Sequence, residues 1–152
     1  MISIYKKNSA EDYLNTAIEV AKWIKQYEVK KPVGKSWKIS SGAGTNDGDA
    51  LANQMTDRSI YSGAAGVGFF FLQLYEVTGN KEYFDEAVQA GEYLLGTYKD
   101  VQKYKPGIHG GITGEGLFAE ALYQKTGEQK YRDYAVKAGD IAYETAIRED
   151  GF

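Results

Sequence analysis

The sequence of 152 residues contains no cysteine, a single histidine and only two prolines. The absence of cysteine excludes disulfides, thiolate ligands for zinc and a cysteine nucleophile. The longest strongly apolar stretch, residues 67–72, is far too short to cross a bilayer. The first residues also lack the apolar stretch of a signal peptide. We therefore expect a cytoplasmic protein that has no membrane partner.

The charged residues give no indication of a polyanionic partner. The net charge is −3, whereas a protein that binds nucleic acid usually shows a clustered basic face. The densest basic stretch, Lys30, Lys31, Lys35 and Lys38, is more typical of a solvated loop than of a binding patch. We expect no nucleic-acid partner.

The strongest signal in the sequence is an internal repeat. Residues 61–95 match residues 109–143 without a gap, at an offset of 48 residues. The matched positions include glycines, aromatic residues and a Thr-Gly pair: Gly66 and Gly68 fall on Gly114 and Gly116, Leu74-Tyr75 on Leu122-Tyr123, Thr78-Gly79 on Thr126-Gly127, and Ala90-Gly91 on Ala138-Gly139. Such a period predicts two copies of one supersecondary unit.

Each unit has the pattern of a helical hairpin. Residues 64–77 are apolar nearly all round, which predicts a buried inner helix. Gly79 ends this helix, because glycine adopts the left-handed conformation at low cost. The residues after Lys81 carry one apolar stripe, which predicts an amphipathic outer helix. Gly91 and Gly139 lie inside the outer helices, where glycine costs about 1 kcal/mol relative to alanine, so we expect close helix–helix approach at both.

Glycines also cluster where each inner helix begins, at Gly63, Gly66 and Gly68 and again at Gly111, Gly114 and Gly116. A string of this kind can indicate a phosphate-binding loop when it follows a strand. No strand-like segment precedes either copy, and the string occurs twice. We therefore favour tight packing at the start of the inner helices.

A further outer-type helix is expected at residues 10–28, because Tyr13, Ala17, Ala21 and Ile24 repeat the pattern of Tyr83, Ala87, Gly91 and Leu94. A long loop over residues 29–59 follows, and loops of this length are often functional. Hairpin one is then expected at residues 61–98 and hairpin two at residues 109–147. The predicted fold is all-α, one domain over residues 1–152 with about five helices.

The hairpins resemble those of lanthionine synthetase C-like proteins. The resemblance rests on Ser62-Gly63-Ala64-Ala65-Gly66, Leu74-Tyr75-Glu76, Thr78-Gly79 and Tyr83, and it extends over about residues 11–145. The family implies an α/α toroid, a closed ring of six or seven hairpins with its active site at the N-termini of the inner helices. Related patterns occur in six-hairpin glycosidases and sugar epimerases. Five helices correspond to an incomplete ring, so we expect a fragment or a short relative.

Cyclase members of this family bind zinc through two cysteines and a histidine and activate a peptide thiol. Because this sequence has no cysteine, we expect no cofactor in the chain, and zinc only if its ligands lie beyond Phe152. The resemblance implies a catalytic role for His109, which precedes the second inner helix. The string from His109 to Gly114 is one residue longer than the family's His-Gly-x-x-Gly motif, and Ser62 stands at the histidine position in hairpin one.

Other candidate site residues follow from their place near the inner-helix starts. Asp57 and Glu115 are candidates, with His109, for acid–base chemistry; Arg58 and Tyr61 are candidates for binding substrate. The alternative roles are a helix cap for Asp57 and a surface ion pair for Arg58. The aromatic residues Trp37, Tyr61 and Tyr104 are expected to line a binding surface. No metal ligand is assigned.

Three functions remain open from the sequence. The first is a lanthionine synthetase C-like protein that binds or modifies a peptide or small-molecule substrate, without zinc-dependent cyclisation by this chain. The second is a carbohydrate-active α/α barrel, which needs two carboxylates across a cavity, here Asp57 and Glu115. The third is a non-enzymatic interaction module. An open arc of hairpins leaves apolar faces uncovered, so we expect a homo-oligomer or missing C-terminal hairpins.

Overall fold

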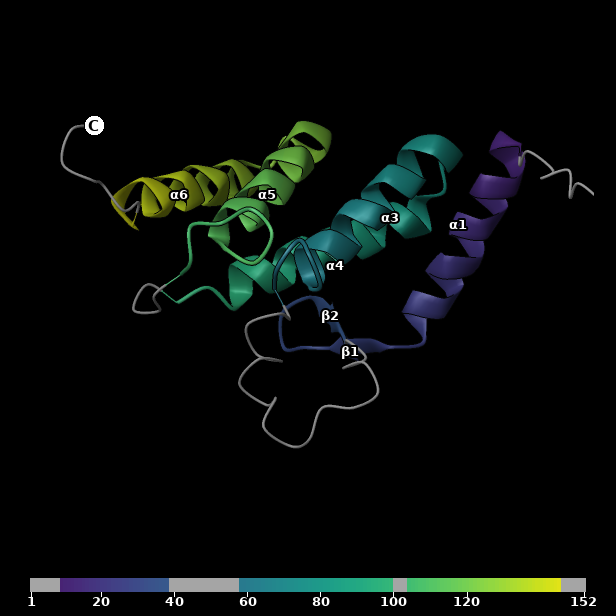
Figure 1. Cartoon of the computed structure of the whole chain (residues 1–152), viewed down its shortest axis with the longest axis horizontal. Helices are drawn as coiled ribbons and strands as arrows, with labels where there is room; N and C mark the ends of the chain where they lie inside the picture. The colour runs from purple at the N-terminus through teal and green to yellow at the C-terminus, as the bar shows by residue number, and fades with distance from the viewer. Residues whose placement is uncertain (1–8, 39–57, 100–103, 146–152) are drawn as a thin grey trace, which may run out of the picture.

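The computed structural model describes residues 9–38, 58–99 and 104–145 (Figure 1). These residues form five helices and one two-stranded sheet: α1 (Ala10–Lys25), β1 (Glu28–Lys30), β2 (Lys35–Trp37), α3 (Ala64–Thr78), α4 (Lys81–Gly96), α5 (Ile112–Thr126) and α6 (Gln129–Thr145). The mostly helical content confirms the all-α prediction, and the two helical hairpins fit an incomplete toroid-like arrangement. None of the helices in these ranges combines the length and the apolar content needed to cross a bilayer.

Both hairpins turn at the predicted glycines. Gly79 and Gly127 have φ angles of 68° and 70°, and each donates its amide to a carbonyl of the preceding helix at 2.7 Å. The second helix of hairpin one then starts at Asn80, whose side chain accepts a hydrogen bond from the amide of Glu82. The prediction that Thr-Gly pairs end the inner helices is confirmed.

The first helix, α1, begins with a capping box in which Ser9 and Asp12 exchange hydrogen bonds. The hydrogen bond from the Ser9 amide lowers the pKa of the Asp12 carboxyl below its ordinary value. The helix ends at Lys25, short of the predicted end at residue 28, because Glu28 already belongs to a strand.

The expectation of a loop throughout residues 29–59 is wrong in its first part. Strands β1 and β2 pair antiparallel there, with Glu28 opposite Trp37. Gly34 takes the left-handed conformation in their turn, where a Cβ atom would lie 2.3 Å from the backbone nitrogen of Tyr93 on α4. Residues 39–57 of the predicted loop lie outside the described residues.

An ionic contact also holds the strands against α4. The ammonium of Lys35 lies 3.0 Å from a carboxylate oxygen of Glu28 and 3.0 Å from one of Glu86. Burial lowers the pKa of Lys35, but its hydrogen bonds to the two carboxylates outweigh burial and raise that pKa above its ordinary value. The strand pair is thus fixed on hairpin one by tertiary contacts.

The core lies where hairpin two packs onto hairpin one. Figure 1 shows α5 beside α3 and α4, and the side chains of Phe118 and Leu122 on α5 are fully buried there. A Cβ atom at Gly68 would lie 2.2 Å from the ring of Phe118, and one at Gly91 would lie 2.4 Å from Leu122. The predicted close approach at Gly91 is therefore confirmed.

At Gly139, the repeat equivalent of Gly91, the prediction of close approach is wrong. Apart from the neighbouring backbone of its own helix, no atom of the described residues lies within 4 Å of a Cβ placed there. The physical reason is its position in the repeat, because no described hairpin follows α6 to cover it.

These two glycines make a matched test of hairpin packing. We expect Gly139→Ala to raise the free energy of unfolding by up to about 1 kcal/mol, the gain in helix propensity. The same change at Gly91 gains that propensity but forces a methyl group against Leu122, and overpacking costs about 1–3 kcal/mol. In denaturant unfolding, the free energy of unfolding of Gly139→Ala should therefore be higher than that of the unchanged protein. That of Gly91→Ala should be lower. Equal effects at both positions would show that hairpin two does not pack on Gly91.

Candidate functional site at the inner-helix mouths

The N-terminal ends of the two inner helices, α3 and α5, lie next to each other. We call these two ends the inner-helix mouths. The amide of Tyr61 donates to the carbonyl of His109 at 3.0 Å, and the two rings meet edge to face with centroids 6.4 Å apart. Both side chains are exposed, Tyr61 to 81%. The structure thus brings together the two residues that occupy equivalent positions in the repeat.

Glycines near the start of the inner helices allow this approach. A Cβ atom at Gly66 would lie 2.1 Å from the carbonyl oxygen of Ile60, and one at Gly114 would lie 2.0 Å from that of Ile108. The amide of Gly66 is already bonded to the carbonyl of Ser59, at 3.3 Å. The glycine strings therefore serve backbone packing, as favoured from the sequence.

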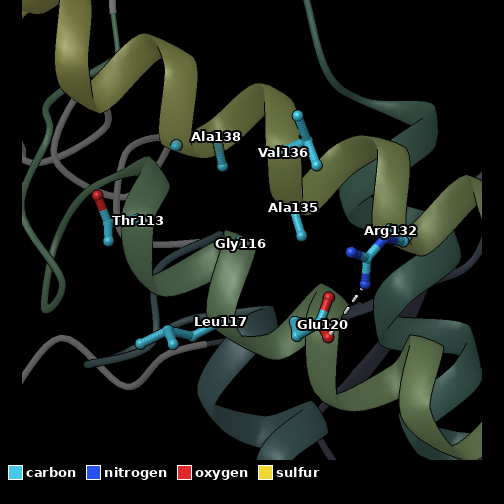
Figure 2. A pocket seen from close by; sticks show the side chains of 9 residues that line it. Thr113, Gly116, Leu117, Glu120, Arg132, Ala135, Val136 and Ala138 are labelled. Carbon is cyan, nitrogen blue, oxygen red and sulfur yellow. Dashed lines mark ion pairs between the residues drawn. The ribbon is translucent and has the colours of Figure 1, made fainter.

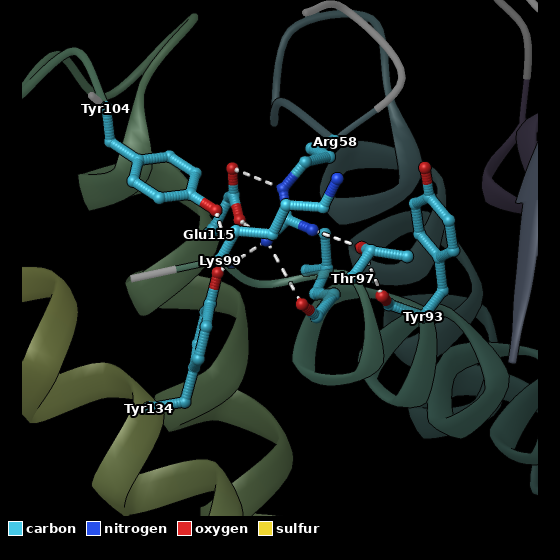
Figure 3. Close-up of polar contacts among 8 residues, drawn as sticks. Arg58, Tyr93, Thr97, Lys99, Tyr104, Glu115 and Tyr134 are labelled. Carbon is cyan, nitrogen blue, oxygen red and sulfur yellow. Dashed lines mark hydrogen bonds and ion pairs between the residues drawn. The ribbon is translucent and has the colours of Figure 1, made fainter. Parts of the chain in front are cut away.

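A buried ion pair lies just behind these mouths (Figure 3). Nε of Arg58 lies 3.3 Å from Oε1 of Glu115, and Nη2 lies 2.6 Å from Oε2. Tyr134 completes the group, because its hydroxyl donates to Oε2 of Glu115 at 2.6 Å and accepts from Nη2 of Arg58 at 2.7 Å. Arg58 is 7% exposed and Glu115 is 3% exposed, so the expected surface ion pair at Arg58 is wrong.

The remaining donors of Arg58 reach the end of α4. Nη2 donates to the carbonyl of Leu94 at 3.0 Å, and Nη1 donates to the hydroxyl of Thr97. A cation is favoured at a helix C-terminus and an anion in a first helical turn, which is where Glu115 lies on α5. One arginine therefore joins three helices, α4, α5 and α6.

The charges of this group are stabilised by one another. Burial lowers the pKa of Arg58, but the Glu115 carboxylate outweighs burial and raises it. The pKa of Tyr134 is raised by burial and by the same carboxylate. Both oxygens of Glu115 are bonded within the protein, so in this structure its carboxylate serves to hold the hairpins together.

The three aromatic residues expected to share a lining are in two different places. Tyr104 stacks on Tyr98 with centroids 5.3 Å apart and lies under the Arg58 guanidinium, 5.8 Å from its central carbon. Trp37 is 4% exposed and packs on Phe71, with centroids 6.0 Å apart. Tyr104 therefore belongs to the surroundings of the ion pair, whereas Trp37 and Tyr61 line adjoining pockets.

The pocket that Trp37 lines is a cavity of about 300 Å³ between α1, β2 and the start of α3, and we call it the mouth pocket. Its lining is mainly aromatic and aliphatic: Trp23, Ile24, Tyr27, Trp37, Lys38, Ser62, Gly63 and Val67. A second cavity of about 270 Å³ shares Ile24, Ser62, Gly63 and Val67 with it and extends to Tyr61. The two cavities adjoin each other through these shared residues, and the second is also lined by the exposed Tyr61.

Sequence reasoning missed Trp23 and Tyr27 in this pocket. Trp23 lies on α1 and Tyr27 lies just after its end, and neither belongs to the apolar stripe predicted for this helix; they are 53% and 38% exposed. The indole Nε1 of Trp37 is buried and has no hydrogen-bond partner among the residues that the structure describes. An unpaired buried donor is uncommon and costs about 1–3 kcal/mol.

The residues at the mouths do not fit the zinc site of the cyclases. The sequence has no cysteine and one histidine, and His109 lies against Tyr61. Within residues 9–38, 58–99 and 104–145, no group of three or more His, Asp and Glu side chains is arranged to hold a metal ion. Asp57, the other carboxylate considered, lies outside the described residues.

The buried ion pair leads to a prediction about stability. We expect Arg58→Met to lower the free energy of unfolding by about 3–5 kcal/mol, because it leaves the Glu115 carboxylate buried without its partner. The double variant Arg58→Met with Glu115→Leu should recover most of this loss, since it removes both charges. Denaturant unfolding of the single and double variants measures the coupling between them.

The exposed pair of Arg132 and Glu120 is the matched control. Its atoms are 3.8 Å apart and its side chains are 50% and 37% exposed, so Arg132→Met should cost less than about 1 kcal/mol. If Arg58→Met were no more costly than Arg132→Met, the buried pair would not be what holds the hairpins.

Comparison with known proteins agrees with this geometry. The family described as lanthionine synthetase C-like protein matches residues 54–140. No curated protein sequence matches the chain. The family match spans more than half of the chain, including the mouths, both inner helices and most of α6. The chain therefore belongs to the lanthionine synthetase C-like family.

Proposed function

We propose that this chain binds a peptide across the inner-helix mouths and does not itself carry out zinc-dependent cyclisation. The observation that supports peptide binding is the depression formed by two adjoining cavities, the mouth pocket and the cavity beside Tyr61. Its walls come from α1, β2 and α3, and it opens beside two exposed rings, Tyr61 and His109.

The chemistry of the depression suits a peptide. Ligand sites are lined mainly by apolar and aromatic side chains, while a few fixed polar groups orient the ligand. Trp23, Tyr27 and Trp37 supply aromatic surface, and Nε1 of Trp37 is a donor that no described residue pairs with. Lys38 adds a positive charge to the lining and forms no ion pair within the described residues. A main-chain carbonyl or a carboxylate is the complementary acceptor.

The chemistry of the rest of the site favours binding over catalysis. The absence of cysteine removes the thiolate ligands on which the family's cyclases depend. Glu115 is bonded to Arg58 and Tyr134 through both oxygens, which leaves it poorly placed to transfer protons. The carbohydrate alternative needed Glu115 as one of two carboxylates, so no observation now favours it.

Tryptophan fluorescence provides a direct test, because the only two tryptophans of the chain, Trp23 and Trp37, both line the mouth pocket. Titration with short unstructured peptides that carry one cysteine should give a saturable change in emission. Replacing both Tyr61 and His109 with alanine should weaken binding at least about tenfold, the equivalent of 1.4 kcal/mol.

The control variant is Tyr13→Ala, which removes another exposed tyrosine, 63% exposed, from the first turn of α1. We expect it to bind peptides like the unchanged protein. The proposal fails if no peptide alters the emission, or if Tyr13→Ala weakens binding as much as the pair of mouth substitutions.

A further inference from the structure

A second concave surface lies on hairpin two, in the groove between α5 and α6 (Figure 2). The cavity measures about 370 Å³, and its floor is formed by small residues: Gly116, Ala135, Ala138 and Gly139. Leu117 and Val136 line it as larger apolar side chains, and Glu120 and Arg132 form an ion pair at one end. We call this surface the α5–α6 face.

The internal repeat shows what a surface of this shape accommodates. The equivalent floor of hairpin one contains Gly68 and Gly91, and hairpin two covers it by placing Phe118 against Gly68 and Leu122 against Gly91. At Gly116 the three atoms nearest to an added Cβ all come from Ala135 and Ala138 of its own hairpin. The α5–α6 face is therefore equivalent to the surface of hairpin one on which hairpin two packs, but no described hairpin packs on it.

The apolar side chains of this face are correspondingly exposed. Leu117 is 49% exposed, whereas its repeat equivalent Phe69 is partly buried and packs on Phe118 with centroids 5.2 Å apart. Val136 is 56% exposed, whereas its equivalent Val88 packs against the core. Contiguous exposed apolar surface of this kind is typical of interaction sites.

We propose that the α5–α6 face binds the same face of a second copy of this chain, in a two-fold symmetric dimer. The face is self-complementary, because it carries both the small-residue floor and the apolar side chains, Leu117 and Val136, that can enter such a floor. In a two-fold interface each contact occurs twice, so Leu117 of each copy enters the floor of the other.

The charges at the rim fit the same arrangement. Glu120 and Arg132 are of opposite sign and loosely paired, with atoms 3.8 Å apart. Across a two-fold axis, Glu120 of one copy can meet Arg132 of the other, which fixes the register of the two faces.

A head-to-tail arrangement is less favourable for this chain. Hairpin two covers hairpin one with Phe118, Leu122 and Tyr131, and the equivalent side chains of hairpin one are Phe70, Leu74 and Tyr83. Leu74 and Tyr83 are only 5% and 9% exposed, and Phe70 is partly buried against the core of its own chain. Leu74 and Tyr83 are therefore not available to cover the α5–α6 face of another copy.

Light scattering over a range of protein concentrations tests the proposal. The unchanged chain, of 16.8 kDa, should reach the mass of a dimer. Val136→Glu and Leu117→Glu should each raise the dissociation constant of the dimer at least about tenfold, while circular dichroism shows the helices unchanged. The control Val77→Glu alters a valine of α3 that is 69% exposed and does not line the groove, and it should dimerise normally.

Cross-linking gives a second readout that does not depend on disrupting the face. Because the chain has no cysteine, Val136→Cys and Leu117→Cys each introduce a single thiol. At least one should form a disulfide-linked dimer under mild oxidation, and Val77→Cys should not. The proposal is overturned if the chain is a monomer at all concentrations, or if both cysteine variants fail to cross-link. It is also overturned if the dimer persists in Val136→Glu and is lost in Trp23→Glu, because the dimer would then form through the mouth pocket.

Discussion

The contact between Arg58 and Glu115 is the constraint on which the arrangement of the hairpins depends. Burying two charges costs several kcal/mol for each ion unless their hydrogen-bonding groups are satisfied. Here the guanidinium meets both carboxylate oxygens, the Tyr134 hydroxyl, the Leu94 carbonyl and Thr97. Because these partners come from three helices, any shift of hairpin two against hairpin one exposes or unpairs a buried charge. The ion pair thereby fixes the neighbouring inner-helix mouths, where Tyr61 and His109 meet.

The two charged residues of this junction have no counterpart in the repeat. At the offset of 48 residues, Arg58 corresponds to Pro106 and Glu115 to Val67. The repeated residues make the hairpins, through the left-handed glycines at their turns and the glycines at their mouths. The unrepeated residues then determine how one hairpin packs on the next. The two copies of the unit therefore differ in their packing, since only one junction among the described residues carries this arginine.

The sequence allowed the hairpins to be predicted because their signals are local. Apolar residues around a whole helix indicate a buried one, and Thr78-Gly79 ends it within a few residues. The strand pair was missed because each strand has three residues and is held by Lys35 and Gly34 against α4, more than fifty residues away. The burial of Arg58 was missed for the same reason, since Glu115 is distant in sequence. The sequence analysis named Tyr61, His109 and Trp37 as candidates, whereas it did not include Trp23 and Tyr27, because neither belongs to the apolar stripe predicted for α1.

The mouth pocket and the α5–α6 face share no residue, and they are built on opposite parts of the chain. The pocket is lined by α1, β2 and the start of α3, whereas the groove is lined by α5 and α6. A two-fold contact through α5 and α6 therefore leaves both mouth pockets open and joins two of them in one particle. A peptide long enough to reach both pockets would then gain avidity, because its second contact becomes intramolecular. Recognition at the mouths and association through hairpin two are thus compatible, and the first does not require the second.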